Sequence, residues 1–106
     1  MDITVNELKE RIDACEAPIM VDVREPHEWE MQALPDVVQI SLGDLPAALE
    51  KLAPFKEQEI VMICRSGGRS GRATAFLQSA GFTNVRNLNG GMLAWKAYID
   101  LSFNVV

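Results

Sequence analysis

The stretch Cys64-Arg65-Ser66-Gly67-Gly68-Arg69-Ser70 is the part of this sequence that most strongly indicates its fold. It follows the mainly apolar run 59–63, whose β-branched residues favour a short buried strand. It precedes residues 72–80, whose amphipathic pattern predicts a helix closed by Gly81. The sequence therefore predicts a cysteine at the carboxyl end of a strand, then a glycine loop, then the N-terminus of a helix.

A loop of this kind favours bound anions. Gly67 and Gly68 let the backbone curl without Cβ clashes, so that successive N–H groups point inward. The predicted helix adds unpaired N–H groups and the positive end of its dipole, and three arginines between residues 65 and 72 add positive charge. Free thiols titrate near ~8.5, and such surroundings lower that value to roughly 3.5–7.5. We expect Cys64 to be a nucleophilic thiolate.

The loop resembles the active-site loop of rhodanese-like (thiosulfate sulfurtransferase) domains. Three further stretches agree with this family in its own order: Val-Asp-Val-Arg-Glu at 21–25, Glu28-Trp29, and Asn-Gly-Gly-Met-Leu-Ala-Trp at 89–95. Together the four blocks span nearly the whole chain. The chain departs from the family at 32–37, where Gln-Ala-Leu-Pro-Asp-Val replaces the Gly-His-Ile-Pro-Gly-Ala of many members. This departure concerns the local backbone and leaves the loop chemistry untouched.

The resemblance implies a double displacement without a cofactor or a metal. The Cys64 thiolate attacks the outer sulfur of a small anionic donor such as thiosulfate, releases sulfite and becomes a persulfide. An acceptor, cyanide in the family's test reaction or a thiol or protein in a cell, then removes the sulfur. The backbone N–H groups of the loop stabilise the negative charge. The predicted substrate-binding residues are Arg65, Ser66, Gly67, Gly68, Arg69 and Ser70.

Two charged residues near the end of an earlier strand are predicted to support the site. Asp22 interrupts the apolar run 19–23, and Arg24 follows it. In one interpretation they brace neighbouring loops by hydrogen bonds. In the other, Arg24 lies beside the Cys64 loop, because open α/β sheets gather binding groups at the carboxyl ends of their strands.

The loop arginines have separate predicted roles. We expect Arg65 to steer the anionic donor. Arg69 either faces the substrate or braces the loop against Asp22 or Glu25, and the sequence does not rank these alternatives.

Two other side chains that could react, one cysteine and one histidine, are expected to lie outside the site. Cys15 ends a predicted helix without a glycine loop or clustered cations, so we expect it to be inert; the alternative is a resolving thiol for Cys64. His27, the only histidine, lies in an acidic segment and is interpreted as a surface residue. Two cysteines without Cys-x-x-Cys or histidine-rich spacing do not predict a metal site.

Alternating strands and helices predict the fold class. Strands are expected at Ile3, 19–23, 37–40, 59–63 and 84–87, and helices from Thr4, at 26–31, at 45–52, at 72–80 and at 92–99. This order predicts a single α/β domain over residues 1–106, with three α/β/α layers, right-handed crossovers and a central, mostly parallel sheet of about five strands. The rhodanese-like resemblance implies the same arrangement.

Composition narrows the range of partners. The net charge of −5 argues against nucleic acid or an anionic membrane as a partner. No apolar run approaches the ~20 residues of a membrane span, and residues 1–4 lack signal-peptide character, so a reducing, cytoplasmic setting is expected. The apolar tail 101–106 either packs on the body or supports self-association, which leaves the oligomeric state undefined.

Two other classes of protein share parts of this pattern. Phosphatases and arsenate reductases also hold a cysteine and a later arginine around an anion, but with five residues between them, whereas four separate Cys64 from Arg69. The tighter ring suits a lone sulfur better than a tetrahedral oxyanion. A rhodanese-like module that binds a partner or carries sulfur with little turnover is the other rival, although such a module needs neither the cysteine nor the intact glycine loop.

Overall fold

The computed structural model describes residues 2–106 and contains one five-stranded parallel sheet. The strands are β1 (Asp2–Ile3), β2 (Ile19–Asp22), β3 (Val38–Gln39), β4 (Ile60–Ile63) and β5 (Val85–Leu88), in the spatial order β1-β5-β4-β2-β3. The α-helices are α1 (Val5–Asp13), α2 (Pro26–Met31), α3 (Leu49–Leu52), α4 (Gly68–Ser79) and α5 (Gly91–Tyr98). The predicted α/β fold class is confirmed.

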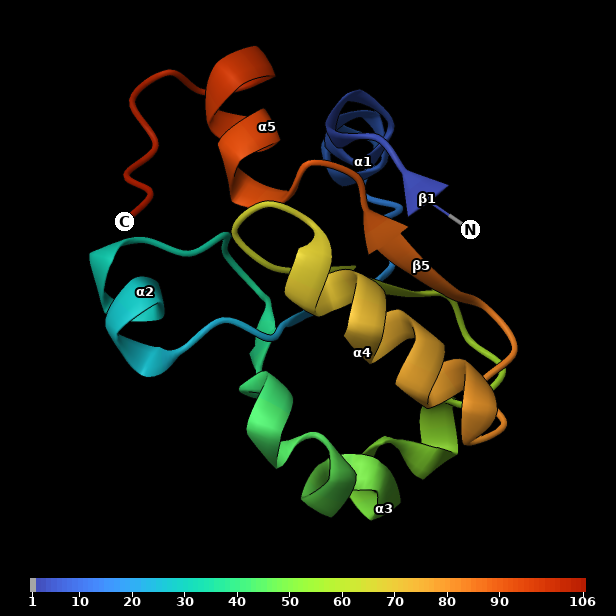
Figure 1. The fold of residues 1–106 in the computed structure, drawn as a ribbon. Helices are drawn as coiled ribbons and strands as arrows, with labels where there is room; N and C mark the ends of the chain where they lie inside the picture. The colour runs from blue at the N-terminus through green and yellow to red at the C-terminus, as the bar shows by residue number, and fades with distance from the viewer. Residues whose placement is uncertain (1) are drawn as a thin grey trace.

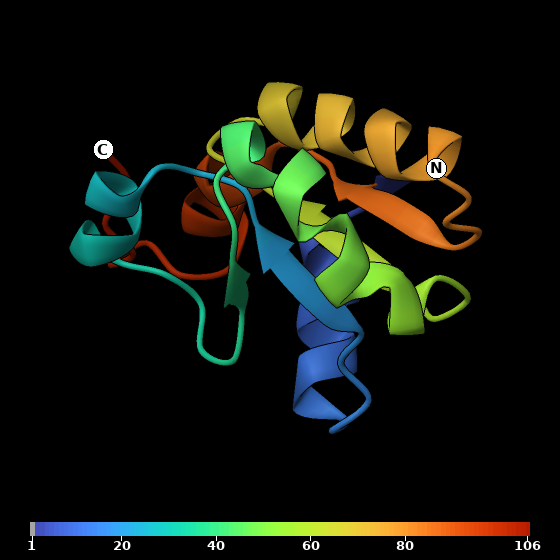
Figure 2. The ribbon, with the colours of Figure 1, turned by 90° about the horizontal axis from the view of Figure 1, so that it is seen from below.

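Helices cover both faces of the sheet, so the molecule has three layers. Helices α1 and α5 lie on one side and α3 and α4 on the other, with α2 beside the sheet edge (Figures 1 and 2). Strand β4 shows why two cores form: Val61 and Ile63 point to the α1/α5 side, and Ile60 and Met62 point to the α3/α4 side. All four residues are fully buried, as expected for the central strand of a parallel sheet.

Two predicted helices differ from the observed ones. The single helix expected at 45–52 is instead two 3₁₀ turns (Leu42–Asp44 and Pro46–Ala48) followed by the short α3 and a third 3₁₀ turn at Ala53–Phe55. Prolines at 46 and 54 lack the N–H donor that a longer α-helix requires, so i→i+3 bonds replace the ladder. Helix α4 begins at Gly68, not at residue 72 as expected, so the turn between β4 and α4 is shorter than predicted.

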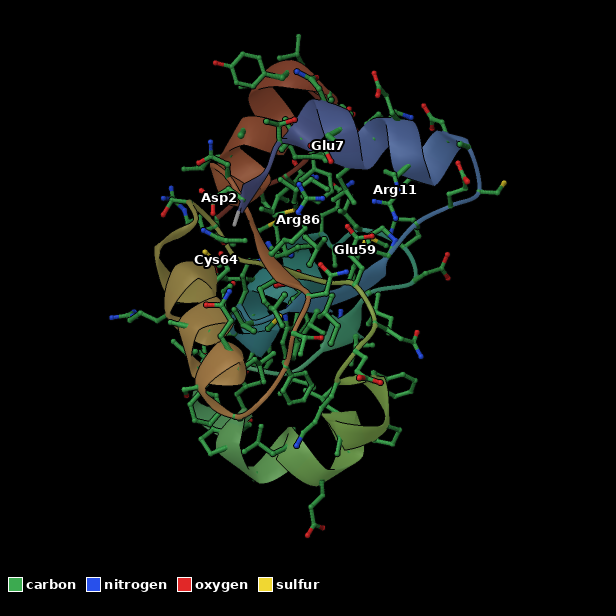
Figure 3. All side chains as sticks on the ribbon, turned by 90° about the vertical axis from the view of Figure 1, so that its right-hand side faces the viewer. Asp2, Glu7, Arg11, Glu59, Cys64 and Arg86 are labelled. Carbon is green, nitrogen blue, oxygen red and sulfur yellow. The ribbon has the colours of Figure 1, made fainter. Side chains whose placement is uncertain are left out.

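A charged cluster closes the end of the sheet opposite to the Cys64 loop (Figure 3). Arg86 of β5 donates to Glu7 and to Glu59, each at 3.1 Å. Arg11 of α1 pairs with Glu59 at 2.6 Å. Figure 3 shows Cys64 apart from this cluster, near the first turn of α4, so the cluster ties α1 to the sheet without touching the loop. Between residues 2 and 106, no helix is long and apolar enough to cross a membrane.

Candidate active site

Cys64 lies where β4 ends, and the chain wraps around its sulfur. The amide of Gly67 donates to Sγ at 3.0 Å, and the hydroxyl of Ser70 lies 3.2 Å from the same sulfur. Helix α4 begins at Gly68, so Ser70 lies in its first turn. The N-terminus of α4 therefore faces the thiol, the arrangement that stabilises a negative charge.

The surroundings of Cys64 favour its thiolate. Burial raises the pKa of the thiol and is the largest single influence on it. The hydroxyl of Ser70 and the amides of Ser70, Gly67 and Ser66 donate to the sulfur and lower the pKa. The lowering influences prevail, so the pKa of the Cys64 thiol lies below its ordinary value. Hydrogen bonds to the charged form are thus the cause of the shift.

The thiol is shielded by its own loop. Cys64 is only 1% exposed, whereas Arg65, Ser66 and Gly68 are exposed. The loop therefore covers the sulfur, with these exposed residues on its outer side.

Only one of the two loop glycines has a conformation that requires glycine. Gly67 has φ of 105° and forms the N-cap of α4. Gly68 is helical, and a Cβ built on it would meet no atom within 4 Å. The curl predicted for both glycines is therefore made by Gly67 alone.

The Gly90–Gly91 turn packs against the Cys64 loop, and backbone hydrogen bonds join the two segments. The amides of Met92 and Leu93, at the start of α5, donate to the carbonyl groups of Cys64 and Arg65, both at 2.9 Å. A Cβ on Gly91 would overlap these two carbonyl groups. This close approach explains why the turn contains glycine, and it places α5 directly against the loop.

Arg69 is paired with a residue that sequence reasoning did not assign to the site. Its Nη1 and Nη2 donate to the two carboxylate oxygens of Glu28, at 2.7 and 2.9 Å, and to neither Asp22 nor Glu25. Glu28 is 5% exposed, and the bond from Arg69 lowers its pKa to about 2. Glu28 also raises the pKa of Arg69, an effect to which the charge of Cys64 adds. Glu28-Trp29 was one of the four stretches that carry the family resemblance, but nothing in the sequence indicated that Glu28 pairs with Arg69.

Asp22 and Arg24 form a buried pair outside the loop. Arg24 donates through Nε and Nη2 to the Asp22 carboxylate at 2.8–3.1 Å, and through Nη2 to the Gln32 carbonyl at 2.9 Å. Both side chains are at most 1% exposed. Within residues 2–106 the pair makes no hydrogen bond to the 64–70 loop, so the geometry agrees with the bracing interpretation.

The remaining reactive side chains lie elsewhere. Cys15 is exposed in the turn that follows α1 and has φ of 58°. His27 is exposed on α2. Arg65 is exposed, and its Nε donates to the carbonyl of Val106, which brings the C-terminal segment beside the loop.

Comparison with known proteins relates most of the chain to one family. Residues 4–98 match the family described as Rhodanese-like domain. The chain is 42% identical over 95 residues to the Bacillus subtilis protein named "Putative sulfurtransferase YtwF", covering 90% of this chain and 89% of that one. It is 34% identical over 97 residues to a protein of Allochromatium vinosum named "Sulfurtransferase", covering 92% and 89%.

A solved structure matches the same fold. The structure of SSP1007 from Staphylococcus saprophyticus superposes with a TM-score of 0.81 at 30% identity, and the match covers 97% of each chain.

Proposed function

Because this chain belongs to the rhodanese-like domain family, we propose that it is a sulfurtransferase that moves sulfane sulfur through a persulfide on Cys64. The observation that carries this proposal is the pair of donors on the Cys64 sulfur, the Gly67 amide and the Ser70 hydroxyl. Both lower the pKa of the thiol and so supply a thiolate without a separate base. The donor is thiosulfate or a similar anion, and the acceptor is a thiol or a protein.

In the first half of the reaction, the Cys64 thiolate attacks the outer sulfur of the donor. The Sγ–S bond forms as the S–S bond of thiosulfate breaks, and the electron pair of that bond leaves with sulfite. The terminal sulfur of the persulfide then carries the negative charge, which the amides from Arg65 to Ser70 stabilise. In the second half, an acceptor nucleophile takes this sulfur and the Cys64 thiolate returns.

The arginines of the loop have different roles in the proposed reaction. The head group of Arg69 is held by Glu28, so Arg69 supplies a fixed positive charge beside the sulfur and keeps the loop in place. Arg65 and Arg72 are exposed beside the loop, and their positive charges attract the anionic donor. Asp22 and Arg24 act as supporting residues that brace the neighbouring segment.

Intact-mass spectrometry after incubation with thiosulfate tests the proposal. We expect the protein to gain the mass of one sulfur atom, and Cys15→Ser, which keeps the loop thiol, to gain it equally. Cys64→Ala should gain nothing. Absence of the added sulfur in the unmodified protein, or its presence in Cys64→Ala, would contradict the proposal.

Measuring turnover distinguishes a sulfurtransferase from a sulfur carrier or a phosphatase. With cyanide as acceptor, a transferase forms thiocyanate repeatedly, whereas a sulfur carrier loads once and turns over little. Hydrolysis of an aryl phosphate faster than consumption of thiosulfate would point to the phosphatase reading.

A further inference from the structure

The side chain of Asn87, in strand β5, forms hydrogen bonds to the Cys64 loop through both its amide nitrogen and its amide oxygen. It pairs in register with Met62 of β4, two residues before Cys64. Its Nδ2 donates to the carbonyl of Gly67 at 3.1 Å, and its Oδ1 accepts from the hydroxyl of Ser70. A Cβ on Gly71 would lie 3.5 Å from Nδ2, so the first turn of α4 packs closely on this amide.

The hydroxyl of Ser70 faces two acceptors with a single proton. Its Oγ lies 3.2 Å from the Cys64 sulfur and within hydrogen-bonding distance of Asn87 Oδ1. A serine hydroxyl donates one hydrogen bond at a time and accepts others. The bond from Nδ2 to the Gly67 carbonyl fixes the amide so that the oxygen, not the nitrogen, faces Ser70. Asn87 therefore competes with the sulfur for this proton.

The competition depends on the charge of the sulfur. While Cys64 is a thiol, its S–H can donate to Ser70 Oγ, and Ser70 donates to Asn87. When the thiol proton leaves to solvent, the thiolate becomes the stronger acceptor, and the hydroxyl turns from Asn87 to the sulfur. Asn87 thus stabilises the arrangement of the neutral thiol.

We propose that Asn87 is a positioning residue that sets how readily Cys64 ionises, acting through the Ser70 hydroxyl. The inference rests on the proposed role of Cys64 as the sulfur-transfer nucleophile. Nothing in residues 84–87 pointed to it, because the sequence predicted only a short strand there. In this proposal Asn87 influences the reaction by changing how readily Cys64 ionises, without touching the substrate.

A double-mutant cycle tests the inference in a Cys15→Ser background, where Cys64 is the only thiol. The thiolate absorbance of each variant is titrated against pH, with Cys64→Ala as the blank. Asn87→Ala should lower the Cys64 pKa more when Ser70 is present than in Ser70→Ala, by about 0.5–1 unit, the worth of one hydrogen bond. Asn87→Asp should raise it, again more when Ser70 is present, because the carboxylate holds the hydroxyl.

Equal pKa shifts in the Ser70 and Ser70→Ala backgrounds would overturn the inference, since they would show that position 87 acts by packing or charge alone. Asn87→Asp is nearly isosteric, so it carries the test by itself if melting curves show that Asn87→Ala is unfolded. The titration needs no sulfur donor. A protein that shows the coupling but gains no sulfur from thiosulfate would refute the proposed function and leave the role of Asn87 intact.

Discussion

At the scale of single residues, the loop depends on one backbone conformation. Gly67 has positive φ and turns the chain so that its amide meets the Cys64 sulfur. Its neighbour Gly68 has ordinary helical geometry with open space around it. Two adjacent glycines that look equivalent in the sequence therefore have different roles.

Alanine substitution should separate these two glycines. Gly67→Ala is expected to destabilise the protein by roughly 1–3 kcal/mol, because a side chain is strained at that φ. Gly68→Ala should be neutral or stabilise by up to about 1 kcal/mol, because alanine is the better helix former. Urea denaturation measures both. Equal losses at the two positions would show that the turn does not depend on Gly67.

At the scale of elements, one ion pair joins α2 to the first turn of α4. Glu28 accepts from both Arg69 nitrogens and, through Oε1, from the Glu25 amide at 2.9 Å, so one carboxylate caps α2 and holds the loop. From the sequence, Arg69 was expected either to face the substrate or to brace the loop against Asp22 or Glu25, two carboxylates of the same segment as Glu28. The side of α2 that faces the loop depends on packing across the sheet, which the sequence does not show.

Acid should weaken this link in a defined pH window. The Glu28 pKa is lowered from 4.5 to about 2, mainly by the bond from Arg69. The folded protein therefore binds this proton less readily than the unfolded chain, so the stabilisation is complete above 4.5 and is lost as the pH falls towards 2. Glu28→Gln should cost roughly 1.5–3 kcal/mol at neutral pH, the range for hydrogen bonds to charged groups.

Denaturation curves across that pH window provide the measurement. The stability difference between the unmodified protein and Glu28→Gln should shrink as the pH falls. Glu30→Gln, at an exposed position on the same helix, is the matched control and should change stability little. A difference that stays constant with pH would show that the carboxylate charge of Glu28 does not stabilise the fold.

At the scale of the whole molecule, the C-terminal segment packs back onto the body. Phe103 is 2% exposed and joins the core on the α1/α5 side. Lys96 donates to the Phe103 carbonyl at 2.6 Å, and the Asn104 amide donates to Gln32 Oε1 at 2.8 Å. Figure 1 shows this segment descending from α5 towards α2. Of the two uses expected for the tail, packing on the body is the one observed.

Two substitutions in this segment should differ sharply. Phe103→Ala leaves a cavity in the core and should cost about 3–5 kcal/mol. Leu101→Ala changes a side chain that is 79% exposed and should stay within about 0.5 kcal/mol. Chemical denaturation compares them. A mild effect at Phe103 would mean that the segment does not contribute to the core in solution.

The sequence by itself determined the fold class and the centre of the site. The apolar run 60–63 indicates a buried strand, and Cys64, Gly67 and the helix after them indicate a strand–turn–helix with the thiol at its turn, because these signals are local and lie within a few residues of one another. The tertiary structure alone decided the partners of that turn. Glu28 lies 41 residues from Arg69, and Asn87 lies 17 residues from Ser70 and 20 from Gly67. The order of the parallel strands, not closeness in the sequence, brings them together.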